Sequence, residues 1–239
     1  RDGEEYLTAN SRIGQLLVEA GQLERNHTWF DEQRAEYPQL RDQLYGLEAD
    51  ILARAGAMND AMQLLNEALA QTSDSTSLRY ARAMLGEQLD DLVLMEKDLR
   101  IILAADPNNA AALNALGYTL ADRTTRYAEA LELVSRAMEL QPNEPAILDS
   151  MGWVLFRTGR YDESIQYLKR AYASFPDPEV ASHLGEALWV GGRVEEAVAV
   201  MNAQDQRAVA AVAAVQNDVA AAIRIVVSCL KQGGRLMYF

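Results

Sequence analysis

Histidine and cysteine side chains commonly bind metals or act as nucleophiles, and the chain has few of them. It contains two histidines, His27 and His183, and one cysteine, Cys229. Neither histidine has a cysteine, histidine or carboxylate at the spacing of a zinc site, so we expect no metal. His183 neighbours Leu184 on an expected helix and is predicted to be a surface or packing residue. Cys229 lies in an apolar stripe, which favours an inert buried thiol over a nucleophile.

Carboxylates and glycine-rich motifs give no stronger case for catalysis. The adjacent pairs Glu195–Glu196 and Asp90–Asp91 stand at expected helix starts or turns, where the helix dipole favours acidic side chains. The sequence has no G-x-S-x-G, no Walker phosphate loop and no G-x-G-x-x-G. We therefore predict that the protein is not an enzyme and has no catalytic residues, no cofactor and no metal.

Composition and charge argue against several classes of partner. The chain has 239 residues, with 35 Asp and Glu against 22 Lys and Arg, and a formal net charge of -13. An acidic surface disfavours nonspecific nucleic-acid binding and docking on an anionic membrane. No apolar run reaches the roughly 18 residues of a membrane span. The sequence opens at Arg1 without a signal-peptide pattern, so we expect a piece of a longer protein whose targeting region is missing.

The spacing of small residues indicates which secondary-structure elements the chain forms. In the stretch GWVLFRTGRYDESIQYLKRA, from Gly152 to Ala171, two apolar-periodic segments flank a polar break. The pattern recurs about every 34 residues, which is a helix-turn-helix period. One small residue per segment would let two antiparallel helices approach closely, while large apolar residues form one stripe per helix. The small residues are Gly117, Gly152 and Gly185 on first helices and Ala130, Ser164 and Ala197 on second helices.

This pattern resembles the tetratricopeptide repeat family over residues 1–204. We predict an all-α, right-handed tetratricopeptide helix-turn-helix solenoid with about six helical pairs and a C-terminal capping helix. Turn glycines are expected at Gly21, Gly56, Gly159 and Gly192. The repeat frames are 7–40, 42–75, 76–109, 110–144, 145–177 and 178–204. The frames 7–40 and 76–109 depart from the family pattern, with Gln33 and Arg82 where alanine and leucine are usual.

A closer resemblance lies in the block from Arg79 to Tyr172, which contains the stretches NALGYTLAD and DSMGWVLFRTGRY. This block resembles the C-terminal repeats of the LbcA family, tetratricopeptide outer-membrane lipoproteins of proteobacteria. The resemblance implies an adaptor that binds a periplasmic carboxyl-terminal processing protease and delivers substrates to it. It also implies a periplasmic location, with the full-length protein anchored in the outer membrane through a signal and lipidation region absent from this chain.

The repeat pattern of the sequence breaks after Met201. The last frame should place alanine at position 204 and proline at position 209, but the residues are Gln204 and Val209. Residues 205–239 are assigned to a tail, with an expected helix over 207–230 that caps the last repeat. Residues 200–239 also resemble the N-terminal segment of N-acetylmuramic acid 6-phosphate etherases. No catalytic residue carries over from that family, because the chain ends before the position of its phosphate loop.

A predicted protein-binding groove follows from the repeat register. The resemblance to tetratricopeptide repeats implies that the first helices line a concave face, with inward positions three before, one after and four after the small residue. The groove residues are Tyr80, Asn114, Tyr118, Asp149, Trp153, Phe156, Arg157, Glu186 and Trp189. Aromatic side chains are enriched at binding hot spots, which favours contact with a partner. The alternative is that the rings pack between repeats. Trp153 is expected to lie across the surface, outside the helix interface.

Three functions stay open on the sequence. The first is a non-catalytic scaffold for a protein or peptide segment, with a carboxyl-terminal processing protease as the partner that the resemblance implies. The second is a truncated fusion to a sugar-phosphate etherase, and the third is a structural module in envelope assembly. None of them involves nucleic acid or a membrane span in this fragment.

Overall fold

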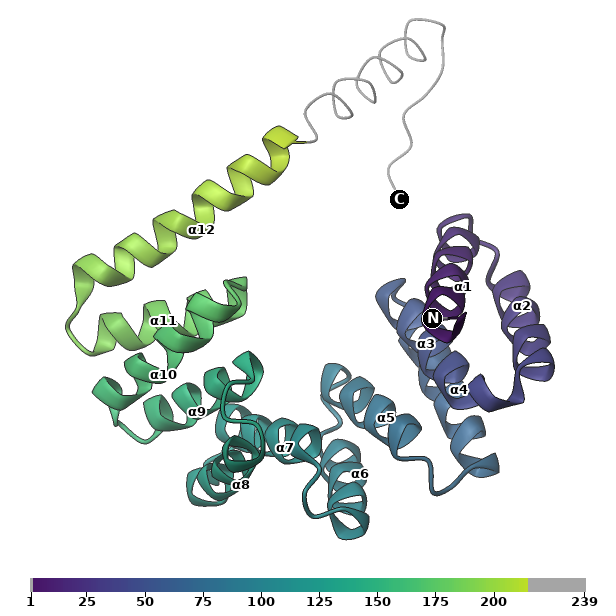
Figure 1. The fold of residues 1–239 in the computed structure, drawn as a ribbon, viewed down its shortest axis with the longest axis horizontal. Helices are drawn as coiled ribbons and strands as arrows, with labels where there is room; N and C mark the ends of the chain where they lie inside the picture. Colours follow the sequence, from purple (N-terminus) through teal and green to yellow (C-terminus); the bar gives the residue numbers. More distant parts are fainter. Residues whose placement is uncertain (1, 215–239) are drawn as a thin grey trace, which may run out of the picture. The chain divides into compact units, whose positions relative to one another are not determined.

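The computed structural model describes residues 2–214, and its α-helices fall into consecutive pairs (Figure 1). The chain divides into two compact units, unit 1 over residues 1–141 and unit 2 over residues 142–239. The pairs of unit 1 are α1 (Asp2–Glu19) with α2 (Leu23–Glu36), α3 (Arg41–Arg54) with α4 (Met58–Gln71), α5 (Thr76–Gln88) with α6 (Leu92–Ala105), and α7 (Ala110–Arg123) with α8 (Tyr127–Leu140). A short 3-10 helix, η1 (Pro38–Leu40), leads into α3. The pairs of unit 2 are α9 (Pro145–Arg157) with α10 (Tyr161–Ser174), and α11 (Pro178–Val190) with α12 (Val194–Ala214).

The architecture confirms the predicted fold class. Residues 2–214 form six helix pairs and no strand. The predicted domain boundary after residue 204 falls inside α12, which is continuous to Ala214. That boundary stays a prediction, and most of the predicted capping helix lies outside the described residues.

The turn inside most pairs depends on one residue in the left-handed region of backbone space. Gly159 has a φ of 79°, which a residue without a Cβ adopts at little cost. The next backbone N–H, of Arg160, donates to the carbonyl oxygen of Leu155 at 2.9 Å and closes the end of α9. Asp90, with a φ of 62°, takes the same place between α5 and α6. The other predicted turn glycines also have positive φ: Gly21, Gly56 and Gly192.

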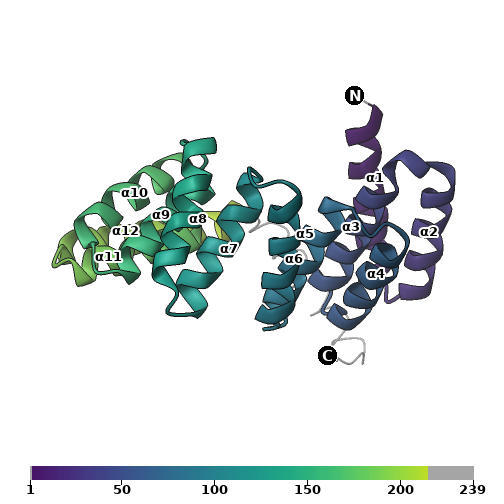
Figure 2. The same ribbon diagram turned by 90° about the horizontal axis from the view of Figure 1, so that it is seen from below.

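A glycine on the first helix sets how closely some pairs approach. A Cβ on Gly152 would lie 2.5 Å from Cγ of Leu168, and a Cβ on Gly117 would lie 2.6 Å from Cγ2 of Val134. Interiors packed to crystal density have no room for such atoms, so glycine is required at both positions. As a result α9 packs along α10, and α7 packs along α8 (Figures 1 and 2).

Replacement by alanine should change stability differently at Gly152 and Gly185, which occupy the same repeat position. Gly152→Ala would force Leu168 out of place and should lower the free energy of unfolding by about 1–3 kcal/mol, the usual cost of overpacking. A Cβ on Gly185 would meet Met201 only at 3.6 Å. Gly185→Ala should therefore be neutral or add about 0.5–1 kcal/mol through helix propensity. Urea unfolding followed by circular dichroism compares the two variants, and equal destabilisation would contradict this explanation of the close approach.

Candidate functional site

Two successive first helices of unit 1 leave a hollow between them. Its volume is about 190 Å³, and its walls come mainly from α3 and α5. We call it the α3–α5 hollow, and it is lined by Gly46, Ala49, Asp50, Ala53, Leu65, Tyr80, Ala81, Met84, Leu85 and Gln88. The predicted groove residue Tyr80 lies in this lining. Ala49 lies two repeat periods before Gly117 and so takes the place of the small residue on α3. The other α3 residues of the lining stand three before, one after and four after it, as the repeat register predicts for a binding face.

Small side chains keep the α3–α5 hollow open. A Cβ added to Gly46 would meet nothing within 4 Å, and Ala49 and Ala53 continue the wall along α3. Tyr80 is half-buried, and burial raises the pKa of its hydroxyl. Among the described residues, this hydroxyl has no hydrogen-bond partner. The hollow therefore offers an apolar wall and one polar group that can donate or accept a hydrogen bond.

In unit 2 the corresponding space between first helices is filled by side chains. Trp153 of α9 is 7% exposed, and its ring stacks on His183 of α11 with centroids 4.2 Å apart and planes inclined at 22°. Phe156 stacks on the same indole at 5.0 Å. Nδ1 of His183 lies 3.0 Å from both carboxylate oxygens of the buried Asp149. The guanidinium carbon of Arg157 is 5.8 Å from the Trp153 ring centroid.

The expectation that Trp153 lies across the surface is therefore wrong. The position of Trp153, one residue after Gly152, predicts the face of α9 on which its side chain lies. The ring is buried on that face because His183 from the next repeat covers it. His183 is a packing histidine, one of the two roles predicted for it. Packing between repeats is thus the alternative that holds for Trp153, and a direct contact between its ring and a partner stays a prediction.

The remaining predicted residues differ in exposure. Glu186 and Trp189 are exposed on α11, Trp189 to 58%. Asn114 and Tyr118 of α7 are half-buried in unit 1. The buried Oδ1 of Asn114 has no hydrogen-bond partner among the described residues. A binding groove that includes Tyr118 and Trp189 stays a prediction.

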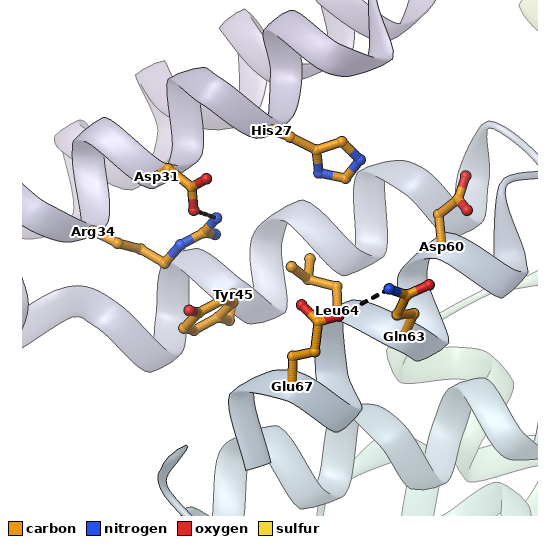
Figure 3. A pocket seen from close by; sticks show the side chains of 8 residues that line it. All are labelled: His27, Asp31, Arg34, Tyr45, Asp60, Gln63, Leu64 and Glu67. Atoms are coloured by element: carbon orange, nitrogen blue, oxygen red, sulfur yellow. Dashed lines mark hydrogen bonds and ion pairs between the residues drawn. The ribbon is translucent and has the colours of Figure 1, made fainter. Parts of the chain in front are cut away.

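A second pocket in unit 1 was not predicted from the sequence. It has a volume of about 270 Å³ and lies between the second helices α2 and α4, with one residue from α3 (Figure 3). We call it the α2–α4 pocket, and it is lined by His27, Asp31, Arg34, Tyr45, Asp60, Gln63, Leu64 and Glu67. Polar residues three and four apart on both helices were the available signal, because that spacing places side chains on one helix face.

A buried carboxylate fixes one wall of the α2–α4 pocket. Glu48 is 0% exposed, and its carboxylate accepts hydrogen bonds from Nη1 of Arg34 at 2.5 Å and from Nδ2 of Asn26 at 3.4 Å. Nδ1 of His27 lies 2.6 Å from the same carboxylate. Burial raises the pKa of Glu48, while Arg34 and His27 act to lower it. The cluster holds Arg34 and His27 in place at the pocket.

The described residues contain neither a metal site nor a membrane span. Within residues 2–214, no group of three or more histidine, cysteine or carboxylate side chains is placed to hold a metal ion. No helix in that range is both long and apolar enough to cross a membrane.

Helix pairs in this register have the tetratricopeptide repeat fold. Residues 108–177 and 150–211 match two models of the tetratricopeptide repeat family. The TPR repeat-containing protein PA4667 of Pseudomonas aeruginosa is 47% identical over 184 residues, which cover 77% of this chain and 31% of that protein. The chain therefore spans about a third of the length of this relative.

Solved structures share the fold at low sequence identity. A tetratricopeptide repeat protein from Parabacteroides merdae has a TM-score of 0.63 at 17% identity, covering 83% of this chain and 78% of that one. TTC0263 of Thermus thermophilus has a TM-score of 0.61 at 21% identity, with coverage of 79% and 99%. PilW, a type IV pilus biogenesis factor, has a TM-score of 0.63 at 20% identity, with coverage of 70% and 77%. These likenesses show the fold alone.

The packing of Trp153 predicts that its removal damages the fold. Trp153→Ala removes the ring that stacks on His183 and Phe156, and should lower the free energy of unfolding by about 3–5 kcal/mol. Trp189→Ala is the matched control, because that indole is 58% exposed, and it should change stability by no more than about 0.5 kcal/mol. Denaturant unfolding measures both, and an unchanged midpoint for Trp153→Ala would show that the ring does not support the packing.

Proposed function

We propose that this chain is a non-catalytic scaffold that binds protein or peptide segments and that the α3–α5 hollow is one of its contact sites. The tetratricopeptide fold supports a role in protein–protein interaction. Repeats that contact only their neighbours present helix faces as binding surfaces. The observation that carries the proposal is the hollow itself, which lies at the register positions predicted for binding and is left open by small side chains.

The chemistry of the α3–α5 hollow suits an apolar side chain on a polar backbone. One large apolar side chain of a partner would lie against Gly46 and Ala49, and burying it contributes about 1.5–3 kcal/mol. The Tyr80 hydroxyl would then donate to a backbone carbonyl or accept from a backbone N–H of the same segment. This combination favours partner segments that have an apolar residue at this point, and it does not require one particular sequence.

Within this role, we propose that the chain acts as the adaptor of a periplasmic carboxyl-terminal processing protease, in a protein anchored in the outer membrane. The resemblance of residues 79–172 to the LbcA family supports this finer proposal. Affinity purification of the tagged chain from a proteobacterial periplasmic extract should retain the protease at moderate salt. Recovery of other proteins without the protease would leave the scaffold role and remove the adaptor role.

Two alternatives stay predictions of the sequence. The etherase fusion concerns residues 200–239, most of which lie outside the described residues. A structural role in envelope assembly would use the same helix faces without delivering a substrate. Neither has an observation in its favour comparable to the open hollow.

Filling the α3–α5 hollow should prevent binding. Gly46→Leu places a side chain where a Cβ meets nothing within 4 Å, so the fold should tolerate it. Peptides selected by panning against the wild-type chain should bind this variant at least about tenfold more weakly, which corresponds to about 1.4 kcal/mol. Fluorescence anisotropy of labelled peptides measures the affinities.

Gly185→Ala provides the matched control, because it also replaces a first-helix glycine but lies outside the hollow. It should bind the selected peptides with wild-type affinity. Circular dichroism and the Tm establish that both variants are folded. If a folded Gly46→Leu variant retained the affinity for every selected peptide, the hollow would not be the binding site.

A further inference from the structure

The second helices carry a repeated ion pair at a fixed register. The third residue of each of α8, α10 and α12 is a glutamate, and an arginine stands three residues before it. In each case the guanidinium lies 2.6 Å from the carboxylate. The pairs are Arg126 with Glu129, Arg160 with Glu163, and Arg193 with Glu196.

A second cation reaches two of these glutamates from the preceding second helix. Nη2 of Arg100 lies 2.6 Å from Glu129, and Nζ of Lys169 lies 2.6 Å from Glu196. Arg100 is the ninth residue of α6, and Lys169 is the ninth residue of α10. The register thus places a basic side chain from one second helix on the acidic third residue of the next.

Between α2 and α4 this arrangement lacks both cations. The third residue of α4 is Asp60, but Ala57 stands three residues before it, and the ninth residue of α2 is the acidic Asp31. Asp60 has no basic partner among the described residues. Among the described residues, Glu67 accepts a hydrogen bond only from Gln63 of the same helix, at 2.9 Å. Figure 3 shows Asp31, Asp60 and Glu67 around the α2–α4 pocket.

The pocket also holds a buried donor without an acceptor. Arg34 is 6% exposed, with its guanidinium 4.1 Å from the Tyr45 ring centroid. Its terminal nitrogens bind Glu48 at 2.5 Å and Asp31 at 2.7 Å. The buried Nε–H has no hydrogen-bond partner among the described residues. A buried donor of this kind is costly to leave unpaired, so it indicates an acceptor from outside the chain.

We propose that the α2–α4 pocket binds a lysine or arginine side chain of a partner protein segment. The cation takes the place that Arg100 and Lys169 fill in other repeats, beside Asp60 and Glu67. A backbone carbonyl of the same segment accepts a hydrogen bond from Nε of Arg34. The inference rests on the proposed scaffold function and adds a second contact, on the second helices, with a defined partner chemistry. Because the pocket is open to solvent, binding weakens as salt rises.

Blocked pentapeptides of sequence Gly-Ser-Xaa-Ser-Gly test the pocket directly. With lysine or arginine at Xaa, NMR titration of the ¹⁵N-labelled chain should shift the amides of α2 and α4, whereas norleucine at Xaa should not. Asp60→Asn with Glu67→Gln should raise the apparent Kd at least about fivefold. The control pair Glu24→Gln with Glu32→Gln removes the same charge from α2 outside the pocket and should leave the Kd within about twofold.

Ala57→Arg offers a second test that keeps every acidic residue. Ala57 has φ -81° and ψ 52°, close to the -82° and 47° of Arg126, so an arginine there can reach Asp60 as Arg126 reaches Glu129. This variant should lose the lysine-peptide shifts and keep its fold. Equal shifts with norleucine, equal weakening by the control pair, or unchanged binding to Ala57→Arg would each overturn the proposal. The lysine and arginine peptides carry no large apolar residue for the α3–α5 hollow, so failure here leaves the Gly46→Leu test of the scaffold function independent.

Discussion

The close approach of two antiparallel helices at one small residue is the constraint on which the other features depend. At Gly152 no side-chain atom can be added, because a Cβ would lie 2.5 Å from Leu168. The contact fixes the rotation of the first helix about its axis. It therefore determines which residues of that helix face away from the second helix of the pair. The α3–α5 hollow and the Trp153 packing use corresponding register positions and differ in side-chain size: α3 has Asp50 and Ala53 where α9 has the larger Trp153 and Phe156.

The spacing of small residues along the sequence is enough to predict the helix pairs. The same spacing does not predict which side chains from other repeats contact a given residue. The small residues and turn glycines recur at a fixed interval, so even the degenerate frame 76–109 holds α5 and α6 as expected. The burial of Trp153 depends on His183 in the next repeat, which spacing within α9 does not show. The α2–α4 pocket was missed because its lining comes from three helices.

Charge is distributed over the second helices in a way that the net value of -13 does not reveal. Glu129 and Glu196 each contact two basic side chains, which holds neighbouring second helices together. Hydrogen bonds from Arg100 and Arg126 lower the pKa of Glu129. Asp60 has the same register without either cation. Tyr45 and Gly46 are adjacent on α3 and line the α2–α4 pocket and the α3–α5 hollow respectively, so one unit offers an acidic and an apolar contact.

Site-specific photocrosslinking tests most directly whether the α3–α5 hollow is a binding site for protein segments. p-Benzoylphenylalanine would replace Met84, which lines the hollow, or Glu132, which is exposed on α8 and lies outside it. A bound segment should form an adduct through position 84 and not through position 132, with mass spectrometry placing the adduct at an apolar residue of the segment. Adducts of equal yield at both positions, or through position 132 alone, would contradict the assignment of the hollow as the site of binding.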